Sequence, residues 1–506
     1  MILPYASPAD MGLDPEAIAR TVERMAEVGT ELHGIVVLRH GHVVAAAEAD
    51  PWTSDQIRLI YSLSKTFCSA AVGIAVEEGR FAYDDLVVDL LPELVDETVG
   101  PVWRTVRVRD LLAMASGHTD ETLFQVASSR VELGEAQLAR FLRLEPGGTP
   151  GVTFAYNQPC TWTLSRLVER HAGRDVLAVL REKVFPAIGA GEAFWQPDSD
   201  GVPIGFSGLH VTTKTIASFF QLLLDDGVRD GERLLPREWV EGHRRKAVET
   251  ARAGMTPDWA AGYGWQVWMA SHGYRGDGAI GQFGIVLPEQ DVVVAITSWS
   301  RDMQATLDVL WSELLPGVDR AVTPGGAEHL ATALEGLRVP TAGTGWASEP
   351  ESAGWEGADS NGDRLQLVVD LVYPQDQRTA PQDTEAVAAA QDADPERDDR
   401  QDADRQRTGS KVAHLTWTDH TGTTHELTAG HDRWEPAELR WGDRWLAVSS
   451  SAAYGESGWT IRMAVLHTPH LVTWTLPQGS DRATFTWSQA PLGPWLVEQL
   501  AQPFPH

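Results

Sequence analysis

The first 315 residues carry two kinds of segment, in an order that restricts how they can fold. Strand-like apolar runs stand near both ends, in "LHGIVVLRHGHVVAAAEA" and "GQFGIVLPEQDVVVAITS". Between them lie amphipathic helical patterns such as "VLAVLREKVFPAIG" and "TTKTIASFFQLLLDDG". A chain with strands at both ends and helices between them can join its ends in a single antiparallel sheet. We therefore predict an α+β domain over residues 1–325, in which an antiparallel sheet is flanked by helices.

The pattern changes after a boundary that is rich in Gly, Pro and Thr, which we assign as a linker over residues 326–346. Beyond it, short alternating segments rich in Trp and Thr are separated by turn signals, as in "ELRWGDRWLAVSS" and "HLVTWTLP". This pattern predicts an all-β domain, a barrel or a sandwich, over residues 347–506. The tryptophans fall in alternating strands, which favours core positions over a sugar-binding platform.

One segment interrupts the C-terminal domain. Residues 375–410 contain many acidic and few apolar side chains, so they cannot bury enough surface to offset chain entropy, and we expect a disordered insertion. Their repeated Asp residues lack the Gly and the final Glu of an EF-hand loop, which argues against a calcium site.

Composition excludes several classes of function. The net charge is −30, which argues against nucleic acid, because phosphate binding needs a clustered basic surface. No stretch approaches the length of a membrane span, and the N-terminus lacks the pattern of a secretion signal. The two cysteines, Cys68 and Cys160, suit a reducing compartment. We expect a cytoplasmic protein with no membrane partner, no metal and no cofactor.

The stretch "YSLSKTF" contains the strongest chemical signal. It places Lys65 three residues after Ser62, on one face of a helix whose continuation, "CSAAVGIAVEEG", is apolar. A serine hydroxyl becomes a good nucleophile when a neighbour accepts its proton, and a buried lysine with a lowered pKa can do so. Ser62 is a better candidate than Ser64, because only Ser62 has a lysine at the third following position.

Five blocks in order resemble one family over about residues 8–315. They are "YSLSKTFCSAAVGIAVEEGRFAYDDLVVDLLPE", "VRVRDLLAMASGH", "FAYNQPCTWTLSRLVE", "FSGLHVTTKTIASFFQLLLDDG" and "GQFGIVLPEQDVVVAITS". They are similar to the serine β-lactamase-related hydrolases, which include class C β-lactamases, penicillin-binding proteins, esterases and D-aminopeptidases. The resemblance implies a sheet with a helical subdomain, an active site between them, and an acyl-enzyme on Ser62 with Lys65 as proton acceptor.

The resemblance also assigns a second motif, Tyr-x-Asn, to "FAYNQPC". Tyr156 matches the tyrosine that assists proton transfer. Gln158 stands where the family has Asn, and its amide keeps the hydrogen-bonding groups while lying about one bond further out. Asn157 is an alternative for the same role, so both residues are candidates for substrate binding.

The third motif of the family, Lys or His followed by Thr or another residue and Gly, corresponds to Gly276-Asp277-Gly278. The cation is absent, which argues against β-lactams, whose carboxylate it helps to bind in the family. The backbone N–H groups of Ser62 and Ala279 would form the oxyanion hole, which needs no side chain. We interpret the adjacent Arg275 as an exposed strand residue.

These residues predict a serine hydrolase that cleaves a small-molecule ester or amide. A D-amino-acid peptidase or amidase, or a β-lactamase, is the alternative within the same superfamily. The altered second and third motifs leave a third alternative open, a catalytically degenerate scaffold that binds a partner. The C-terminal domain resembles the lipocalin-like or β-barrel appendage of several relatives. The sequence leaves open the natural substrate, the role of that domain, and whether the chain forms a homo-oligomer.

Overall fold

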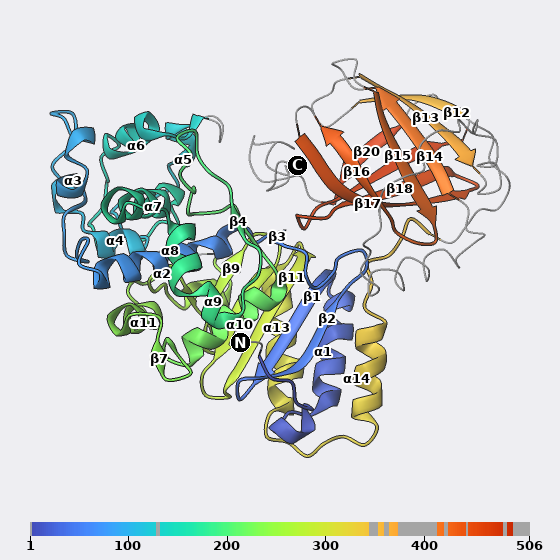
Figure 1. The fold of residues 1–506 in the computed structure, drawn as a ribbon, viewed down its shortest axis with the longest axis horizontal. Helices are drawn as coiled ribbons and strands as arrows, with labels where there is room; N and C mark the ends of the chain where they lie inside the picture. The colour runs from blue at the N-terminus through green and yellow to red at the C-terminus, as the bar shows by residue number, and fades with distance from the viewer. Residues whose placement is uncertain are drawn as a thin grey trace, which may run out of the picture. The chain divides into compact units, whose positions relative to one another are not determined.

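The computed structural model describes residues 3–127, 132–252, 254–343, 353–358, 364–372, 412–418, 424–441, 444–478 and 483–488. The acidic insertion expected over residues 375–410 lies outside this part of the chain. The chain divides into two compact units, and the boundary between them falls between Val339 and Pro340 (Figure 1).

The first unit is built around an antiparallel sheet of six strands, in the order β2-β1-β11-β10-β9-β8. β1 pairs with both β2 and β11, and Ile35 lies opposite Ile296, so the two ends of this unit meet in one sheet as predicted. The strand bounds are β1 Thr30–Arg39, β2 His42–Glu48, β8 Trp268–Met269, β9 Tyr274–Gly278, β10 Gln282–Leu287 and β11 Val292–Ser300.

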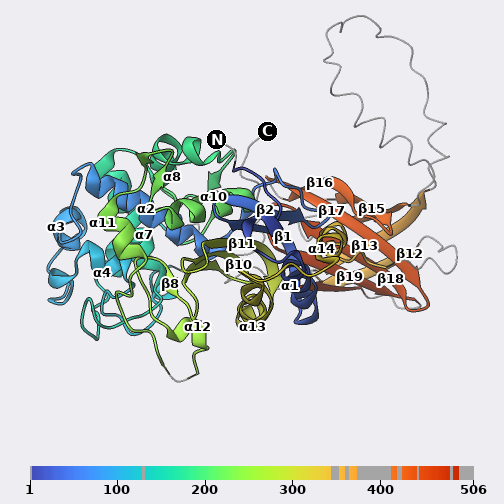
Figure 2. The ribbon, with the colours of Figure 1, turned by 90° about the horizontal axis from the view of Figure 1, so that it is seen from below.

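Helices cover both faces of this sheet (Figure 2). Alternate residues of β11 point to opposite faces, so Val294 and Ile296 belong to one apolar cluster while Val293 and Ala295 belong to another. The first cluster packs under α1 (Pro15–Glu27) and α13 (Met303–Val309), and the second under α2 (Ser64–Glu77) and α10 (Thr213–Leu224). Successive side chains of a strand point to opposite faces of a sheet, so a continuous apolar run such as β11 fills the core on both faces.

The chain leaves the sheet after β2 and returns to it at β8, and most of the intervening residues form the helical part of the unit. Within this part, β5 pairs with β3 on one side and with β4 on the other, which forms a small sheet of three short strands. The elements are β3 Arg58–Leu59, α3 Val87–Leu90, α4 Val108–Leu112, α5 Leu123–Val126, α6 Glu135–Leu142, α7 Gln158–Ala172, α8 Val176–Lys183, α9 Phe185–Ile188, β4 Phe194–Trp195, β5 Leu209–Val211, β6 Val228–Arg229, β7 Glu232–Arg233, α11 Arg237–His243 and α12 Pro257–Ala260.

The segment expected to be a linker begins with a helix. α14 (Gly326–Glu335) packs against α1, and Leu330 is buried in the cluster beneath that helix. Its Gly-rich start, Gly325-Gly326, carries a loop signal in the sequence, while the apolar residues that hold the helix in place are few. α14 therefore belongs to the first unit.

The second unit contains one sheet of nine strands. The path runs β12-β13-β14-β15-β17-β18-β19-β20, and β16 pairs with β17. The ends of the path, β12 and β20, come close to each other, but no backbone pairing joins them in the described residues, so no closed barrel forms there. Trp434, Trp459 and Trp474 are buried, as the core interpretation expects. The strand bounds are β12 Ala353–Ala358, β13 Arg364–Val372, β14 Val412–Thr418, β15 Thr424–His431, β16 Glu435–Trp441, β17 Arg444–Gly455, β18 Gly458–Val465, β19 Leu471–Pro477 and β20 Thr484–Trp487.

Candidate active site

Ser62 lies in a 3₁₀ turn, Tyr61–Leu63, that leads directly into α2. Tyr61 has a positive φ of 48°, so the chain turns sharply immediately before the serine. The first turn of α2 places Lys65 beside Ser62, and the Lys65 Nζ lies 2.9 Å from the Ser62 Oγ. The structure therefore brings together the two residues that the sequence spacing paired.

Lys65 is only 1% exposed. Its Nζ also donates a hydrogen bond to the Phe206 carbonyl oxygen at 2.8 Å and lies 4.7 Å from the centre of the Tyr156 ring. Burial lowers the pKa of Lys65 to about 7, although the negative charges of Glu121 and Asp277 oppose this shift. A large fraction of the lysine is therefore neutral near pH 7 and can accept a proton.

Tyr156 stands two residues before α7 begins at Gln158, and its ring stacks on Trp268 with the centroids 5.3 Å apart. Burial is the main cause that raises the pKa of Tyr156, and the charge of Asp277 adds to it, while a hydrogen bond to Ser62 works against it. The tyrosine is therefore a neutral phenol near pH 7, and it contacts the same hydroxyl that Lys65 contacts. Lys65, rather than Tyr156, is the group able to act as a base.

The segment Phe206–Leu209 holds the Tyr61–Leu63 turn and the start of α2 through three hydrogen bonds. The Phe206 carbonyl accepts from Lys65, the Leu209 N–H donates to the Ser64 Oγ at 3.0 Å, and the Leu209 carbonyl accepts from the Ile60 N–H at 3.0 Å. Ser64 in turn donates to the Tyr61 carbonyl at 2.6 Å. Ser64 is fully buried and bonded within the frame, so it serves the turn, while Ser62 is the partly exposed serine.

Asn157 and Gln158, the two amide candidates, occupy different environments. Asn157 is buried, and its Oδ1 accepts from the Thr122 N–H and hydroxyl at 3.0 and 2.9 Å. In the described residues no hydrogen bond uses its Nδ2 or the Gln158 Oε1. Gln158 makes no hydrogen bond to Lys65, whose bonds go to Ser62 and Phe206. The binding role of both amides stays a prediction.

Glu121 is a site residue that the sequence analysis missed. Its carboxylate accepts from the N–H groups of Leu123 at 2.7 Å and Gln158 at 3.1 Å, which ties the start of α7 to the segment before α5. Burial raises its pKa, and its charge is the largest influence that opposes the shift of Lys65. It lies just beyond the block that ends at "SGH", and no spacing in the sequence links it to Lys65.

Gly276 and Gly278 allow β9 to lie directly against Ile60 and the Tyr61–Leu63 turn that follows it. A Cβ at Gly276 would lie 2.5 Å from the Leu63 Cδ1, and a Cβ at Gly278 would lie 2.1 Å from the Ile60 carbonyl oxygen. Both distances are too short for a real side chain. β8 pairs with β9 at Tyr274 and Arg275 alone, so the glycine end of β9 is open on that side.

Asp277 and Arg275 form a buried ion pair on the other face of β9. The Arg275 Nη2 lies 3.3 Å from the Asp277 Oδ2, and Arg275 is 0% exposed. Its Nη1 donates to the Asp258 and Met269 carbonyl oxygens, and its guanidinium lies 4.2 Å from the centre of the Trp259 ring. The interpretation of Arg275 as an exposed residue is therefore wrong. Its side chain points to a face of β9 that α12 and β8 cover. Asp277 is also buried, and burial raises its pKa.

Ala279 follows β9 at the point where the strand ends. No hydrogen bond in the described residues uses its backbone N–H. Its methyl group packs against a small apolar cluster of Leu59, Tyr61 and Ile280, which places it beside the turn that carries Ser62. The assignment of its N–H to an oxyanion hole stays a prediction that this placement is compatible with.

Other features of the first unit lie away from these residues. A half-open pocket of 520 Å³ borders α4 and the loop around Pro150, and Ser62, Lys65 and Tyr156 do not line it. In the described ranges, no group of three His, Cys, Asp or Glu side chains has the arrangement of a metal site. No helix there combines the length and the apolar character that crossing a membrane requires.

Comparison with known proteins places this geometry in a family. The sequence model of the family named Beta-lactamase matches residues 19–314, more than half of the chain. The chain belongs to the Beta-lactamase family. It is a serine hydrolase of this family, as the resemblance of the five blocks implies.

Individual relatives and solved structures are similar to this chain. The chain is 26% identical over 344 residues to a 6-aminohexanoate-dimer hydrolase of Paenarthrobacter ureafaciens, with 63% of this chain and 86% of that protein covered. A putative 6-aminohexanoate-dimer hydrolase from Bacillus anthracis aligns with a TM-score of 0.48 and 20% identity over 57% of this chain and 79% of its own. An octameric penicillin-binding protein homologue from Pyrococcus abyssi aligns with a TM-score of 0.47 and 15% identity over 90% and 97% of the two chains.

Proposed function

We propose that the chain cleaves an ester or amide bond in two steps through an acyl-enzyme on Ser62. The observation that carries this proposal is the buried Lys65 amine, 2.9 Å from the Ser62 Oγ, with its pKa lowered to about 7. A neutral amine at this distance can take the hydroxyl proton as the oxygen attacks a carbonyl carbon.

The first step forms a bond between the Ser62 Oγ and the carbonyl carbon while the Oγ–H proton moves to the Lys65 Nζ. The backbone N–H groups of Ser62 and Ala279 donate hydrogen bonds to the carbonyl oxygen and stabilise its negative charge. The bond to the leaving alcohol or amine then breaks. The Tyr156 hydroxyl, a neutral phenol in contact with Ser62, donates the proton to that group and regains one from the Lys65 ammonium.

In the second step water attacks the acyl carbon, and the same residues transfer protons in the reverse direction. Lys65, through Tyr156, accepts a proton from the water, and the Ser62 oxygen leaves with a proton as the carboxylic acid is released. Each step returns the protons that it borrows, so no cofactor enters the balance.

The charges around the site bear on the class of substrate. The carboxyl groups of Glu121 and Asp277 both lie close enough to Lys65 to raise its pKa, and Asp277 is paired with Arg275. Arg275, the cation beside the motif, is buried and already holds two carbonyl groups and Asp277. Because the motif's own cation is absent and Arg275 is already paired, these charges favour substrates without a carboxylate near the scissile bond over β-lactams. We assign the contacts with that substrate to Asn157, Gln158 and the backbone of Gly276–Gly278.

Labelling with a fluorophosphonate, followed by mass mapping of the modified peptide, tests the proposal. We expect one adduct on Ser62, its loss in Ser62→Ala, and its retention in Ser64→Ala, which serves as the matched control. Full labelling of Ser62→Ala would overturn the assignment. Absence of any adduct in the unmodified chain would support the scaffold alternative.

A panel of p-nitrophenyl esters, nitrocefin, D-amino-acid amides and the linear 6-aminohexanoate dimer separates the substrate classes. The last compound is included because the curated relative is named for it. We expect turnover of esters or linear amides and little turnover of nitrocefin. Efficient nitrocefin hydrolysis would contradict the argument from charge.

A cytoplasmic location is a further part of this proposal.

A further inference from the structure

The carbonyl group that contacts Lys65 comes from a loop with no helix or strand of its own. Residues 197–206 connect β4 to the segment Phe206–Leu209, which is hydrogen-bonded to the Tyr61–Leu63 turn and the start of α2. The position of the Phe206 carbonyl therefore depends on what holds this loop. The Lys65 Nζ has two hydrogen-bond partners in the described residues, the Ser62 Oγ and this carbonyl.

The hydrogen bond to the Phe206 carbonyl oxygen sets the orientation of the Lys65 amine. A neutral amine has two N–H groups and one lone pair. Donation of one N–H to the Phe206 carbonyl, at 2.8 Å, leaves the lone pair free to face Ser62 at 2.9 Å. If the carbonyl moves, the amine loses the contact that sets its rotation, even though Lys65 and Ser62 are both present.

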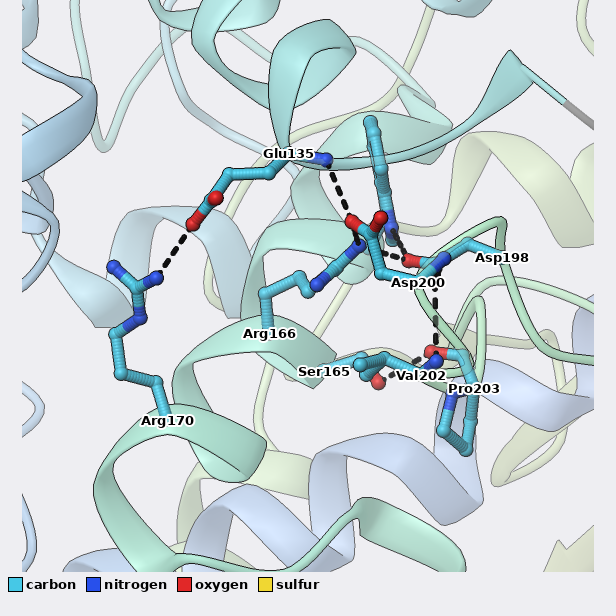
Figure 3. A network of polar contacts seen from close by, with 9 residues as sticks. Glu135, Ser165, Arg166, Arg170, Asp198, Asp200, Val202 and Pro203 are labelled. Atoms are coloured by element: carbon cyan, nitrogen blue, oxygen red, sulfur yellow. Dashed lines mark hydrogen bonds and ion pairs between the residues drawn. The ribbon is translucent and has the colours of Figure 1, made fainter.

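One arginine of α7 binds this loop through two carboxylates (Figure 3). The Arg166 Nη2 lies 2.6 Å from the Asp198 Oδ2 and 2.5 Å from the Asp200 Oδ2. Arg166 is 9% exposed and Asp198 is 6% exposed, so their contact is largely removed from water, whereas the Asp200 side chain is 44% exposed. One nitrogen of the guanidinium thus contacts both carboxylates, and its contact with the buried Asp198 is stronger than a surface ion pair.

Asp198 also fixes the shape of the loop. Its Oδ1 accepts from the Asp200 N–H at 3.0 Å and the Val202 N–H at 3.1 Å, and its Oδ2 accepts from the Trp162 indole at 3.0 Å. Both oxygens are thus occupied by the loop itself and by α7. Arg166 supplies the positive charge that balances this buried carboxylate.

The remaining contacts lead from Arg166 to Lys65. Ser165, the neighbour of Arg166, donates to the Pro203 carbonyl at 2.6 Å. Gly205 then passes so close to α7 and α2 that a Cβ there would lie 2.9 Å from the Ser165 Cβ and 3.1 Å from the Cys68 Sγ. The next residue is Phe206. The loop is thus attached to α7 at both of its ends, and its last attachment is next to the carbonyl that meets Lys65.

We propose that Arg166 is a positioning residue for Lys65, acting through Asp198, Asp200 and the Phe206 carbonyl. It touches no reacting atom; it fixes the loop that directs the amine of Lys65 toward Ser62. This inference rests on the proposed function, because it assigns Arg166 a role in the reactivity of Ser62.

Arg170 offers a matched control on the same helix. It lies one turn after Arg166 and pairs with Glu93 and Glu135. Glu135 also meets the loop, but through its backbone N–H, which donates to the Asp200 Oδ2 at 2.9 Å, whereas Arg170 contacts the Glu135 side chain (Figure 3). We compare Arg166→Met and Arg170→Met by the rate of p-nitrophenyl ester turnover per Ser62 site, with sites counted by fluorophosphonate labelling. Each variant is assayed well below its own melting temperature.

We expect Arg166→Met to lower kcat per labelled site by about 10-fold or more, with KM changed less than about twofold, since misplacement of a catalytic group by 1 Å can cost up to 10²-fold. Arg170→Met should stay within about twofold of the unmodified chain. Arg166→Lys should recover part of the loss, because it keeps the positive charge that balances Asp198, while its ammonium stands on a shorter side chain than the Arg166 Nη2 that contacts both carboxylates.

A structural role alone would lower the number of labelled sites and leave the rate per site unchanged, and that result would overturn the proposal. Equal losses in Arg166→Met and Arg170→Met would overturn it as well. If Arg166→Met does not fold, Ser165→Ala and Asp200→Asn replace it, since each removes one attachment of the loop, and both should lower the rate per site by about threefold or more. Failure of the unmodified chain to label would count against the proposed function and is a separate result.

Discussion

Lys65 and Arg275 are two buried cations near the same site, and their surroundings differ. Lys65 is 1% exposed, and its hydrogen bonds go to a hydroxyl and a carbonyl, which are neutral. Arg275 is 0% exposed, but it faces the Asp277 carboxylate, two carbonyl oxygens and the Trp259 ring. Burial lowers the pKa of both side chains. The lysine reaches the range where it can lose its proton, while the guanidinium starts higher and has a carboxylate that opposes the shift. Both side chains are buried, so the difference between them comes from the higher ordinary pKa of the guanidinium and from its direct carboxylate partner.

The largest expected effect is on Lys65. Lys65→Met should lower turnover by about 10³-fold or more, because the nucleophile loses its proton acceptor. The same variant should be more stable near pH 7. The pKa is about 7 in the folded chain and 10.5 as the ordinary value, so folding must remove a proton that the unfolded chain retains. Below pH 7 the lysine stays protonated and folding must instead bury its charge, so the penalty is fully present there, and it disappears above about pH 10.5.

Thermal and urea unfolding at pH 7 and pH 10 measure this second effect. We expect Lys65→Met to gain about 1–3 kcal/mol at pH 7 after the loss of two hydrogen bonds, and to gain less at pH 10. A variant that is less stable than the unmodified chain at pH 7 would contradict the description of Lys65 as a strained buried amine.

Arg275→Met should have the opposite effect on stability. It removes the partner of Asp277 and leaves a buried carboxylate with no cation, which costs about 3–5 kcal/mol in comparable sites. Urea unfolding at pH 7 measures the loss. The double variant Arg275→Met with Asp277→Leu removes both charges and should recover much of the stability. If it does not, the contacts of Arg275 with Trp259 and the backbone, rather than the ion pair, are what stabilise this face.

The pH profile sharpens the comparison further. If Lys65 must be neutral to accept a proton, kcat/KM should fall about tenfold per pH unit well below 7 and reach a plateau above it. Arg275 should contribute no limb in this range, because a guanidinium stays protonated. A profile that is flat between pH 5 and pH 8 would contradict the assignment of Lys65 as the base.

The smallest effect is expected for Glu121→Gln. The charge of Glu121 holds the pKa of Lys65 above the level that burial alone would set. Its removal should therefore shift the acidic limb to lower pH and raise kcat/KM modestly, by less than about tenfold at pH 6. Asn157→Asp, which adds an acid near the same helix start, is the matched control and should shift the limb the other way.

The sequence predicted those parts of the molecule that depend on side-chain pattern. The apolar runs near both ends of the first domain located β1 and β11 in the sheet, and the spacing of Ser62 and Lys65 located the turn that brings these two side chains together. The Phe206 carbonyl could not be predicted, because a backbone group has no signature and its loop lies 141 residues from Lys65. Arg275 was assigned to the surface because a short polar strand resembles an exposed one, and its burial depends on α12 and β8, which are distant from any motif. α14 was missed because its first residues are glycines.

The contact of Gly276 and Gly278 with the nucleophile turn limits how this enzyme could be redesigned. Restoring the family's missing cation at Gly276 would require a long side chain to begin where Leu63 already stands. The buried side chains of Leu63, Thr66 and Phe220 would all have to move away from it. A preference for carboxylate-bearing substrates therefore cannot be installed by one replacement at that position. Any such conversion would have to begin at Asp277, with Arg275 rebuilt at the same time.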